Sequence, residues 1–334
     1  MKKSRSHMTE ILNILLICFI SYINFSIPGN SLVITLISSV ILAVIFSVCT
    51  AARATVNLCI GLAASALIFM LEPVTHDLNY IFESCIAMLD LFLPAFVLSL
   101  CFSNKKLGLG KTLYFTTGAN LLVNLLSLAK IRYIDKINLI EQVNTVYDEI
   151  FSTYTSLIAG STAIEGAGDI TAVFDAIKEL SVMLIPALLI ISCMAVSYIL
   201  IVATRGMLKT YFREEHTEIE YFFQLRTGKL LSTVTIVLLL LAFMSGDAYF
   251  TSAIYNFAVI AGFIYFINGL SVVYFYLIKS IRVVPLAMLV LAVAFIVSLF
   301  AAVLMPAINV FTLLFVVGLL DSSANFRRLK KVGE

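Results

Sequence analysis

About ten long apolar segments, separated by short polar loops, constrain this chain more than any other feature of its sequence. Hydrophobic residues make up 61% of the 334 residues and charged residues only 13%, whereas soluble domains average about 45–50% and 25%. A helix of about 20 apolar residues crosses the roughly 30 Å of hydrocarbon in a bilayer. The segments lie near residues 11–27, 31–49, 54–71, 84–102, 112–129, 181–204, 229–245, 251–278, 283–303 and 306–320. The sequence therefore predicts an all-α, polytopic transmembrane helix bundle of about ten spans, a multi-pass protein of the cell membrane.

The basic residues predict the orientation of the spans. If the amino terminus is cytoplasmic, the outer segments hold only four of the 22 Lys and Arg residues, namely Lys130, Arg132, Lys136 and Lys178. The others fall in inner segments, as the positive-inside rule requires. An even number of spans then places both termini in the cytoplasm. The position of the carboxyl terminus depends on the short segment 306–320, about 22 Å long as a helix.

The loops divide the chain into three parts. We predict a first transmembrane helix group at 1–129, an external amphipathic helical hairpin at 130–180, and a second helix group with a basic cytoplasmic tail at 181–334. Apolar residues of the hairpin recur at spacings of three and four, which predicts one helical stripe. The stripe consists of Ile140, Val143, Tyr147, Ile150, Tyr154 and Leu157. Gly160 ends this helix, and Asp169 is the predicted N-cap of a second helix that runs into the span at 181. The hairpin is either a connector that covers helix ends or a lid over a binding site.

Sequence motifs for catalysis and nucleotide binding are missing. The sequence has no GxxxxGK[ST] loop, no HExxH pair and no GxSxG turn. His7, His76 and His216 lie in loops without metal-ligand spacing, and the six cysteines form no CxxC pair. We therefore expect a protein that is not an enzyme and has no metal and no other cofactor. The net charge of +2 gives no reason to expect a nucleic-acid partner.

Polar residues inside the predicted spans are candidates for a binding site. Asp90 is the only carboxylate well inside an apolar segment, and an acid at that depth costs about 2.5–3.5 kcal/mol on insertion scales, so it is a functional candidate by default. Asn124, Asn256 and Pro186 lie at a similar predicted depth, and Asn120 lies one turn deeper than Asn124. These side chains are predicted to face the bundle interior and bind a small polar or cationic ligand. The alternative is that the Asn residues hydrogen-bond to neighbouring helices and hold the bundle together.

The carboxyl end holds a second group of candidates. Asp321 is expected to follow the last span at the inner boundary, and Arg327 and Arg328 are close enough in sequence to pair with it if the helix continues. Lys330 and Lys331 can attract anionic lipid headgroups. Asp321, Arg327 and Arg328 are therefore predicted to contact lipid or a cytoplasmic partner. The alternative is a helix-end anchor without a partner.

The same end resembles the YybS-like family of uncharacterised bacterial membrane proteins, most clearly over about 250–330. Members of that family typically end in Gly-Leu-x-Asp, four further residues and then Phe-Arg. The matching features here are Gly269-Leu270-Ser271-Val272-Val273-Tyr274, Pro285, Pro306, Gly318-Leu319-Leu320-Asp321 and Phe326-Arg327. This chain departs from the family in having no Trp. Ser322, Ser323, Ala324 and Asn325 fill a stretch that is often aromatic.

The resemblance implies a loose relation to the substrate-binding membrane subunits of energy-coupling-factor vitamin transporters. That relation would imply a small-molecule binding site that is reached from outside the cell. Those subunits typically have six helices, and the Ala-x-x-x-Ala surface of their first helix is absent from residues 11–27.

The sequence favours a small-molecule transport or substrate-binding component. Because the chain has no nucleotide site of its own, an ATP-driven role would need a separate ATPase. The alternative is a non-catalytic membrane scaffold or regulator of envelope processes, and a membrane-embedded enzyme comes third. A polar cavity open to the outside would favour transport, whereas an interior lined only by apolar side chains would favour the scaffold.

Overall fold

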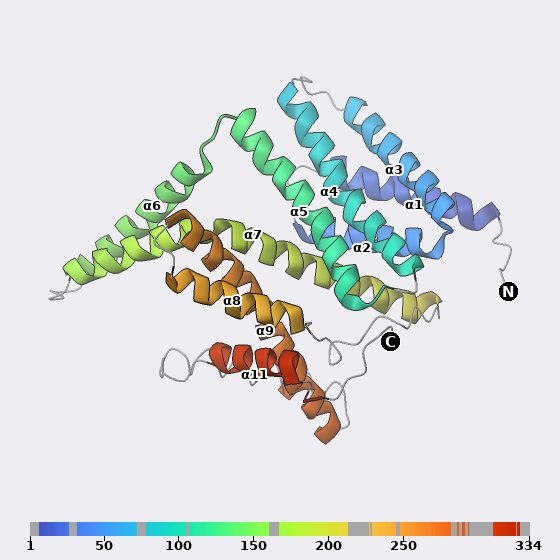
Figure 1. Cartoon of the computed structure of the whole chain (residues 1–334). Coiled ribbons are helices and arrows are strands. Elements are labelled where there is room, and N and C mark those ends of the chain that lie inside the picture. Colours follow the sequence, from blue (N-terminus) through green and yellow to red (C-terminus); the bar gives the residue numbers. More distant parts are fainter. Residues whose placement is uncertain are drawn as a thin grey trace. The chain divides into compact units, whose positions relative to one another are not determined.

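In a computed structural model, the described part of the chain consists of helices and their connections. The structure describes residues 7–26, 32–71, 78–104, 107–159, 167–212, 227, 229–244, 248–281, 286, 289, 290, 293, 310–324, 326 and 327. Within these ranges it has ten helices and no strand. They are α1 (His7–Ser26), α2 (Leu32–Val48), α3 (Ala51–Leu71), α4 (Leu78–Ser103), α5 (Leu109–Tyr133), α6 (Leu139–Ala159), α7 (Ala167–Phe212), α8 (Lys229–Met244), α9 (Ala248–Ile281) and α11 (Val310–Ala324) (Figure 1).

Five of the described helices are long and apolar enough to cross a membrane. They comprise Ala51–Leu71, Asn79–Ser103, Leu109–Tyr133, Phe174–Tyr211 and Phe250–Ile281. Glu10–Phe25, Leu32–Val48 and Phe311–Ala324 are apolar but shorter. The prediction of a helical protein with several helices long and apolar enough to span a membrane is confirmed for the described residues, whereas the count of ten spans and the cytoplasmic termini stay predictions. Most of the expected span at 283–303 lies outside the described residues.

The contacts divide the chain into two compact units. The first comprises Met1–Val182 and Ser192–Glu218, and the second comprises Met183–Ile191 and Ile219–Glu334. One short stretch of α7 thus belongs to the second unit, whereas the rest of that helix belongs to the first. The division predicted from the loops, at 129 and 180, stays a prediction.

In the first unit, α2 and α4 pack against each other. Phe46 of α2 is fully buried and meets Phe96 of α4 edge to face, with ring centroids 6.2 Å apart. The Ser39 hydroxyl of α2 donates a hydrogen bond to a backbone carbonyl of α4 at 3.1 Å. Gly61 of α3 lies against the ring of Phe92, where a Cβ atom would come within 2.7 Å of Cζ. Small residues and interhelical hydrogen bonds of this kind hold transmembrane helices together, because lipid offers no hydrophobic force between them.

α6 and the first turns of α7 form a helical hairpin, visible as two adjacent green helices (Figure 1). The Tyr147 hydroxyl donates to Ser181 Oγ at 2.6 Å, and the Lys178 ammonium pairs with Asp148 at 2.7 Å. The second helix continues without a break into the apolar part of α7. Gly160 and Tyr154 to Leu157 lie where side chains or backbone are not described. The position of this hairpin outside the membrane stays a prediction.

In the second unit, α9 and α11 approach each other closely at two glycines. A Cβ atom on Gly269 would come within 2.8 Å of the Leu314 carbonyl carbon, and one on Gly318 within 2.8 Å of the Gly269 nitrogen. Only residues without a side chain let two helix backbones come this near. Beside the glycines, the fully buried ring of Tyr265 meets Phe315 edge to face, with centroids 5.7 Å apart.

Candidate functional site

Asp90 lies on α4, and it differs from Asn120, Asn124 and Asn256 in having no hydrogen-bond partner among the described residues. Its side chain is half-buried, and the structure gives its carboxylate no hydrogen bond and no ion pair to any residue in the described ranges. The carboxylate is close enough to the Cys193 sulfur of α7 to interact with it electrostatically. An acid in the interior of a membrane bundle normally pairs with a basic group or with backbone groups. Among the predicted site residues that the structure describes, Asp90 therefore supplies a charge that is available for a ligand.

Asn124 lies beside the same sulfur. Its Nδ2 donates to Cys193 Sγ at 3.6 Å and to the backbone carbonyl of Asn120, one turn earlier on α5, at 2.9 Å. Asn124 is half-buried. Side chains from α4, α5 and α7 thus gather around Cys193, and this group, Asp90, Asn124 and Cys193, is called the Cys193 cluster below. The sequence did not single out Cys193, because a lone cysteine in an apolar span looks like an ordinary core residue.

Asn120 serves as a link between helices. Its side chain is 5% exposed, and its Nδ2 donates to the Ser197 hydroxyl of α7 at 2.6 Å. Ser197 is itself fully buried. This contact agrees with the alternative interpretation of the Asn residues, in which an interhelical hydrogen bond holds the bundle together. Asn120 thus joins α5 to α7, one turn of α5 away from Asn124 of the Cys193 cluster.

Asn256 of α9 hydrogen-bonds to the backbone of α7 next to Pro186. Pro186 has no backbone N–H, and a proline inside a helix opens the local hydrogen-bond ladder. The Ala187 N–H, which in a regular helix donates to the Met183 carbonyl, donates to Asn256 Oδ1 at 3.0 Å. Asn256 Nδ2 in turn donates to the Met183 carbonyl at 2.8 Å. The amide thus bridges these two backbone groups.

This bridge uses both polar atoms of the Asn256 amide. Asn256 Nδ2 also donates to the Ser252 carbonyl, at 3.0 Å. The bonds from Asn256 to Ala187 and Met183, on either side of Pro186, agree with the similar depths predicted for Asn256 and Pro186. The four-helix polar layer expected from the sequence is thus assigned to two units. Asp90, Asn120 and Asn124 belong to the first, and Asn256 and Pro186 to the second.

A buried ion pair joins the end of α11 to α9. The Arg327 guanidinium meets Asp321 Oδ2 through Nη2 at 2.7 Å and Nε at 3.2 Å. Both side chains have 0% exposed area. Arg327 also donates from Nη1 to Ser271 Oγ at 2.7 Å and from Nη2 to Asn268 Oδ1 at 3.1 Å. A buried pair needs such additional hydrogen bonds to offset the desolvation of its charges.

Further contacts extend this network, which is called the Arg327 network below. Asn268 Nδ2 donates to the Gly318 carbonyl at 2.7 Å and to Ser322 Oγ at 3.0 Å, and Ser322 also contacts Thr227. The sequence analysis missed Asn268 altogether. A lone Asn in an apolar run has no distinctive pattern, although its position next to Gly269 was a signal that two backbones meet there.

The structure adds detail to the sequence prediction for this end. Asp321 lies within α11, which extends to Ala324, and its place after the last membrane span stays a prediction. Arg327 reaches Asp321 from a turn after the helix, rather than from a continuing helix. The Asp321 and Arg327 side chains have no exposed area and contact each other and α9, and their predicted contact with lipid or a cytoplasmic partner stays a prediction. Arg328 lies outside the described residues.

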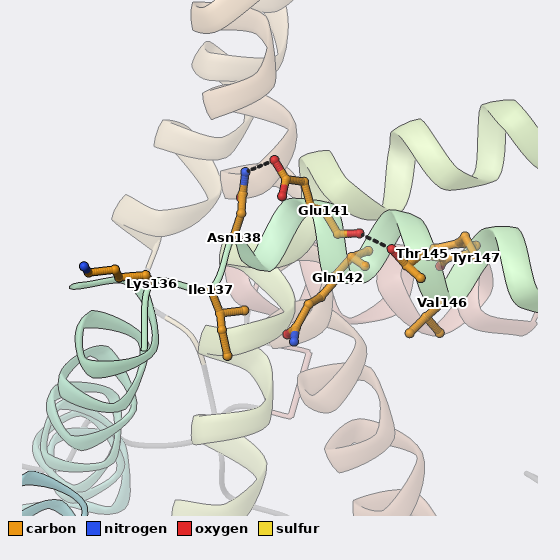
Figure 2. A pocket seen from close by; sticks show the side chains of 9 residues that line it. Lys136, Ile137, Asn138, Glu141, Gln142, Thr145, Val146 and Tyr147 are labelled. Atoms are coloured by element: carbon orange, nitrogen blue, oxygen red, sulfur yellow. Dashed lines mark hydrogen bonds between the residues drawn. The ribbon is translucent and has the colours of Figure 1, made fainter. Parts of the chain in front are cut away.

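A hollow of about 930 Å³ lies at the start of α6. It is lined by Lys136, Ile137, Asn138, Glu141, Gln142, Val143, Thr145, Val146 and Tyr147. Figure 2 shows Asn138 and Glu141 directed toward each other, and Asn138 Nδ2 donates to Glu141 Oε1 at 2.8 Å. Asn138 Oδ1 also accepts from the Ile140 N–H at 3.3 Å, which is the geometry of a helix N-cap. The polar groups of the hollow thus stabilise the start of the helix, and no residue predicted for the binding site lines it.

The described residues contain no group of three or more His, Cys, Asp or Glu that could hold a metal ion. Several apolar helices of spanning length, with buried polar links between helices, are the features of a helical membrane protein. A comparison with protein families identifies the family within this class. Residues 14–321 match the model of the family described as predicted membrane protein DUF2232, and the chain belongs to that family. No match was found among curated proteins or among solved structures.

Proposed function

We propose that this membrane protein is a non-enzymatic component of small-molecule transport or substrate binding in the cell membrane. The Cys193 cluster is its proposed ligand site. The observation that carries the proposal is the half-buried Asp90 carboxylate, which has no hydrogen-bond or ion-pair partner among the described residues. An ionised group held in an apolar environment interacts far more strongly with an opposite charge than it does in water. The proposed ligand is therefore a small polar molecule with a cationic group.

The neighbouring contacts support this assignment. Asn120 and Asn256 are engaged in links between helices, so of the four predicted ligand contacts only Asp90 and Asn124 stay in the proposed site. Asn124 adds an amide next to Cys193. The resemblance at the carboxyl end supports a YybS-like assignment within the family, with a site reached from outside. Because the sequence has no nucleotide-binding loop, coupling to ATP would require another protein.

A thermal-stability screen of the purified full chain tests the proposal. Melting temperatures are measured in detergent with a panel of organic cations, namely choline, thiamine, putrescine and basic amino acids, and with neutral analogues of each. We expect at least one cation to stabilise the wild-type protein and to lose its effect in Asp90→Asn, while Asp90→Glu keeps part of it. Because the Asn side chain is nearly isosteric, helical content measured by circular dichroism should not change.

Glu83→Gln is the matched control. Glu83 lies on the same helix as Asp90, but its side chain is 69% exposed and is 3.5 Å from the Lys130 ammonium. Neutralising it should leave the response to the cation unchanged. A stabilising cation that acts equally on wild type and Asp90→Asn would reject the binding role of Asp90. Under the scaffold alternative no compound of the panel stabilises the protein, and Asp90→Asn raises its melting temperature by removing a buried charge.

A further inference from the structure

An apolar groove of about 680 Å³ lies between α9 and α11. Its lining consists of Val272, Val273, Tyr276, Leu277, Val317, Leu320 and Phe326. The volume falls in the range of about 300–1,000 Å³ that is typical of small-molecule sites. Leu320 and Phe326 are 48% and 52% exposed, so the groove opens to the surface of the second unit. We call it the α9–α11 groove.

The Arg327 network shapes one end of this groove. Arg327 turns inward to Asp321 and has no exposed area. Its neighbour Phe326 turns outward and joins the lining. The turn after α11 thus removes a charge from the groove and places an aromatic ring there, so an occupant of the groove meets an apolar wall.

A cationic side chain lies where α9 leaves the groove. Lys279 follows Tyr276 by three residues, and helix residues at that spacing share a face. Lys279 is exposed and forms no ion pair with any described residue. It lies in the last turn of α9, just beyond the predicted span 251–278, which is the depth of lipid headgroups. Tyr276 is 46% exposed, and tyrosines gather at that level of membrane proteins.

The described residues of the segment that follows α9 do not fill the α9–α11 groove. Leu286, Leu289 and Val293 are 46%, 60% and 51% exposed, and none of them lines the groove. The lining is apolar, and the exposed charge that we place next to it among the described residues, Lys279, is positive. An amphiphile with an acyl chain and an anionic head matches both features, whereas a zwitterionic lipid matches only the first.

We propose that the α9–α11 groove is a binding site for an anionic phospholipid, with one acyl chain in the groove and the phosphate at Lys279. Basic pockets between transmembrane helices bind anionic headgroups in this way. The site is independent of the Cys193 cluster, so it can fail while the proposed function holds, and the reverse.

The test uses the purified full chain after delipidation in detergent. Phosphatidylglycerol and phosphatidylcholine with identical acyl chains are added, and binding is followed by native mass spectrometry and melting temperature. We expect phosphatidylglycerol to bind more tightly than phosphatidylcholine. Lys279→Gln should weaken phosphatidylglycerol binding about fivefold, the effect of one basic residue near a headgroup, and leave phosphatidylcholine unchanged. Lys209→Gln, which removes an exposed lysine in the last turn of α7, should alter neither.

Two further measurements separate the lipid from other occupants. Val273→Trp places a large side chain in the groove and should reduce binding of both lipids. Glycerol phosphate, the headgroup chemistry without chains, should not stabilise the protein. Equal affinity for both lipids in the wild type would overturn the proposal, as would an unchanged preference in Lys279→Gln or stabilisation by glycerol phosphate as strong as by the lipid. Should Val273→Trp fail to fold, the surface variant Lys279→Gln still decides the question.

Discussion

Substituting Gly269 by Ala tests whether α9 and α11 meet backbone to backbone. The added methyl group would lie 2.8 Å from the carbonyl carbon of Leu314, whereas carbon atoms in contact are about 3.5–4.0 Å apart. The two helices would have to separate by about 1 Å. The obstacle is backbone, which cannot rotate away as a side chain can, so the cost should lie near the upper end of the roughly 1–3 kcal/mol measured for overpacking. Ala gains about 1 kcal/mol over Gly in a helix, which leaves a net loss of about 2 kcal/mol.

Gly262→Ala is the matched control on the same helix. A Cβ atom at Gly262 meets nothing within 4 Å, so only the helix-propensity gain of about 1 kcal/mol should be seen. The two variants should thus differ by about 3 kcal/mol in the free energy of unfolding. The assay is reversible unfolding in mixed micelles of a mild detergent and sodium dodecyl sulfate, followed by circular dichroism. If Gly269→Ala is as stable as Gly262→Ala, the close approach of α9 and α11 is wrong.

Three further predictions concern the ion pair, the α7 bridge and the orientation. In the same unfolding assay, Arg327→Met should lower the free energy of unfolding by about 3–5 kcal/mol, because it leaves the buried Asp321 carboxylate unpaired. Adding Asp321→Asn should restore part of that free energy, and a double variant no more stable than Arg327→Met would contradict the pairing. Asn256→Leu should cost about 1–3 kcal/mol by leaving two backbone groups of α7 without partners, and a neutral effect would show that α7 closes its own ladder. In a background without the native cysteines, a membrane-impermeant thiol reagent applied from outside should modify Cys at position 165 and spare Cys at 216; the opposite pattern would reverse the orientation.

The helices could be predicted from the sequence because their signal is local. Apolar length and turn residues are read within each segment, and the helix at 139–159 and the long helix into the span at 181 needed nothing else. The end of α11 could not be found in this way. Its last turn contains Asp321 and Ser322, which look like the start of a polar loop. Ser322 is held by Asn268 of the distant helix α9, and Asp321 by Arg327, which folds back from the turn after α11.

The candidate site shows the same limit. The depth of Asp90 could be estimated from its span, and the similar depths of Asn256 and Pro186 were visible. Whether an Asn binds a ligand or bridges two helices depends on which helices are adjacent, and one sequence does not contain that information. Asn256 bridges a proline break, whereas Asp90 has no partner among the described residues. Both were candidates from their predicted depth, and Asp90 stood out only as the one carboxylate well inside an apolar segment.

The proposed site requires the Asp90 carboxylate of α4 to be accessible to a ligand, whereas the Asp321 carboxylate of α11 is buried in its ion pair with Arg327. Dicyclohexylcarbodiimide, an apolar reagent for carboxyl groups within membranes, tests it directly on the full chain, with the modified residues identified by peptide mass spectrometry. We expect modification at Asp90, none at Asp321, and loss of the labelled peptide in Asp90→Asn. Modification of Asp321 at a rate equal to that of Asp90, or an unmodified Asp90, would contradict it.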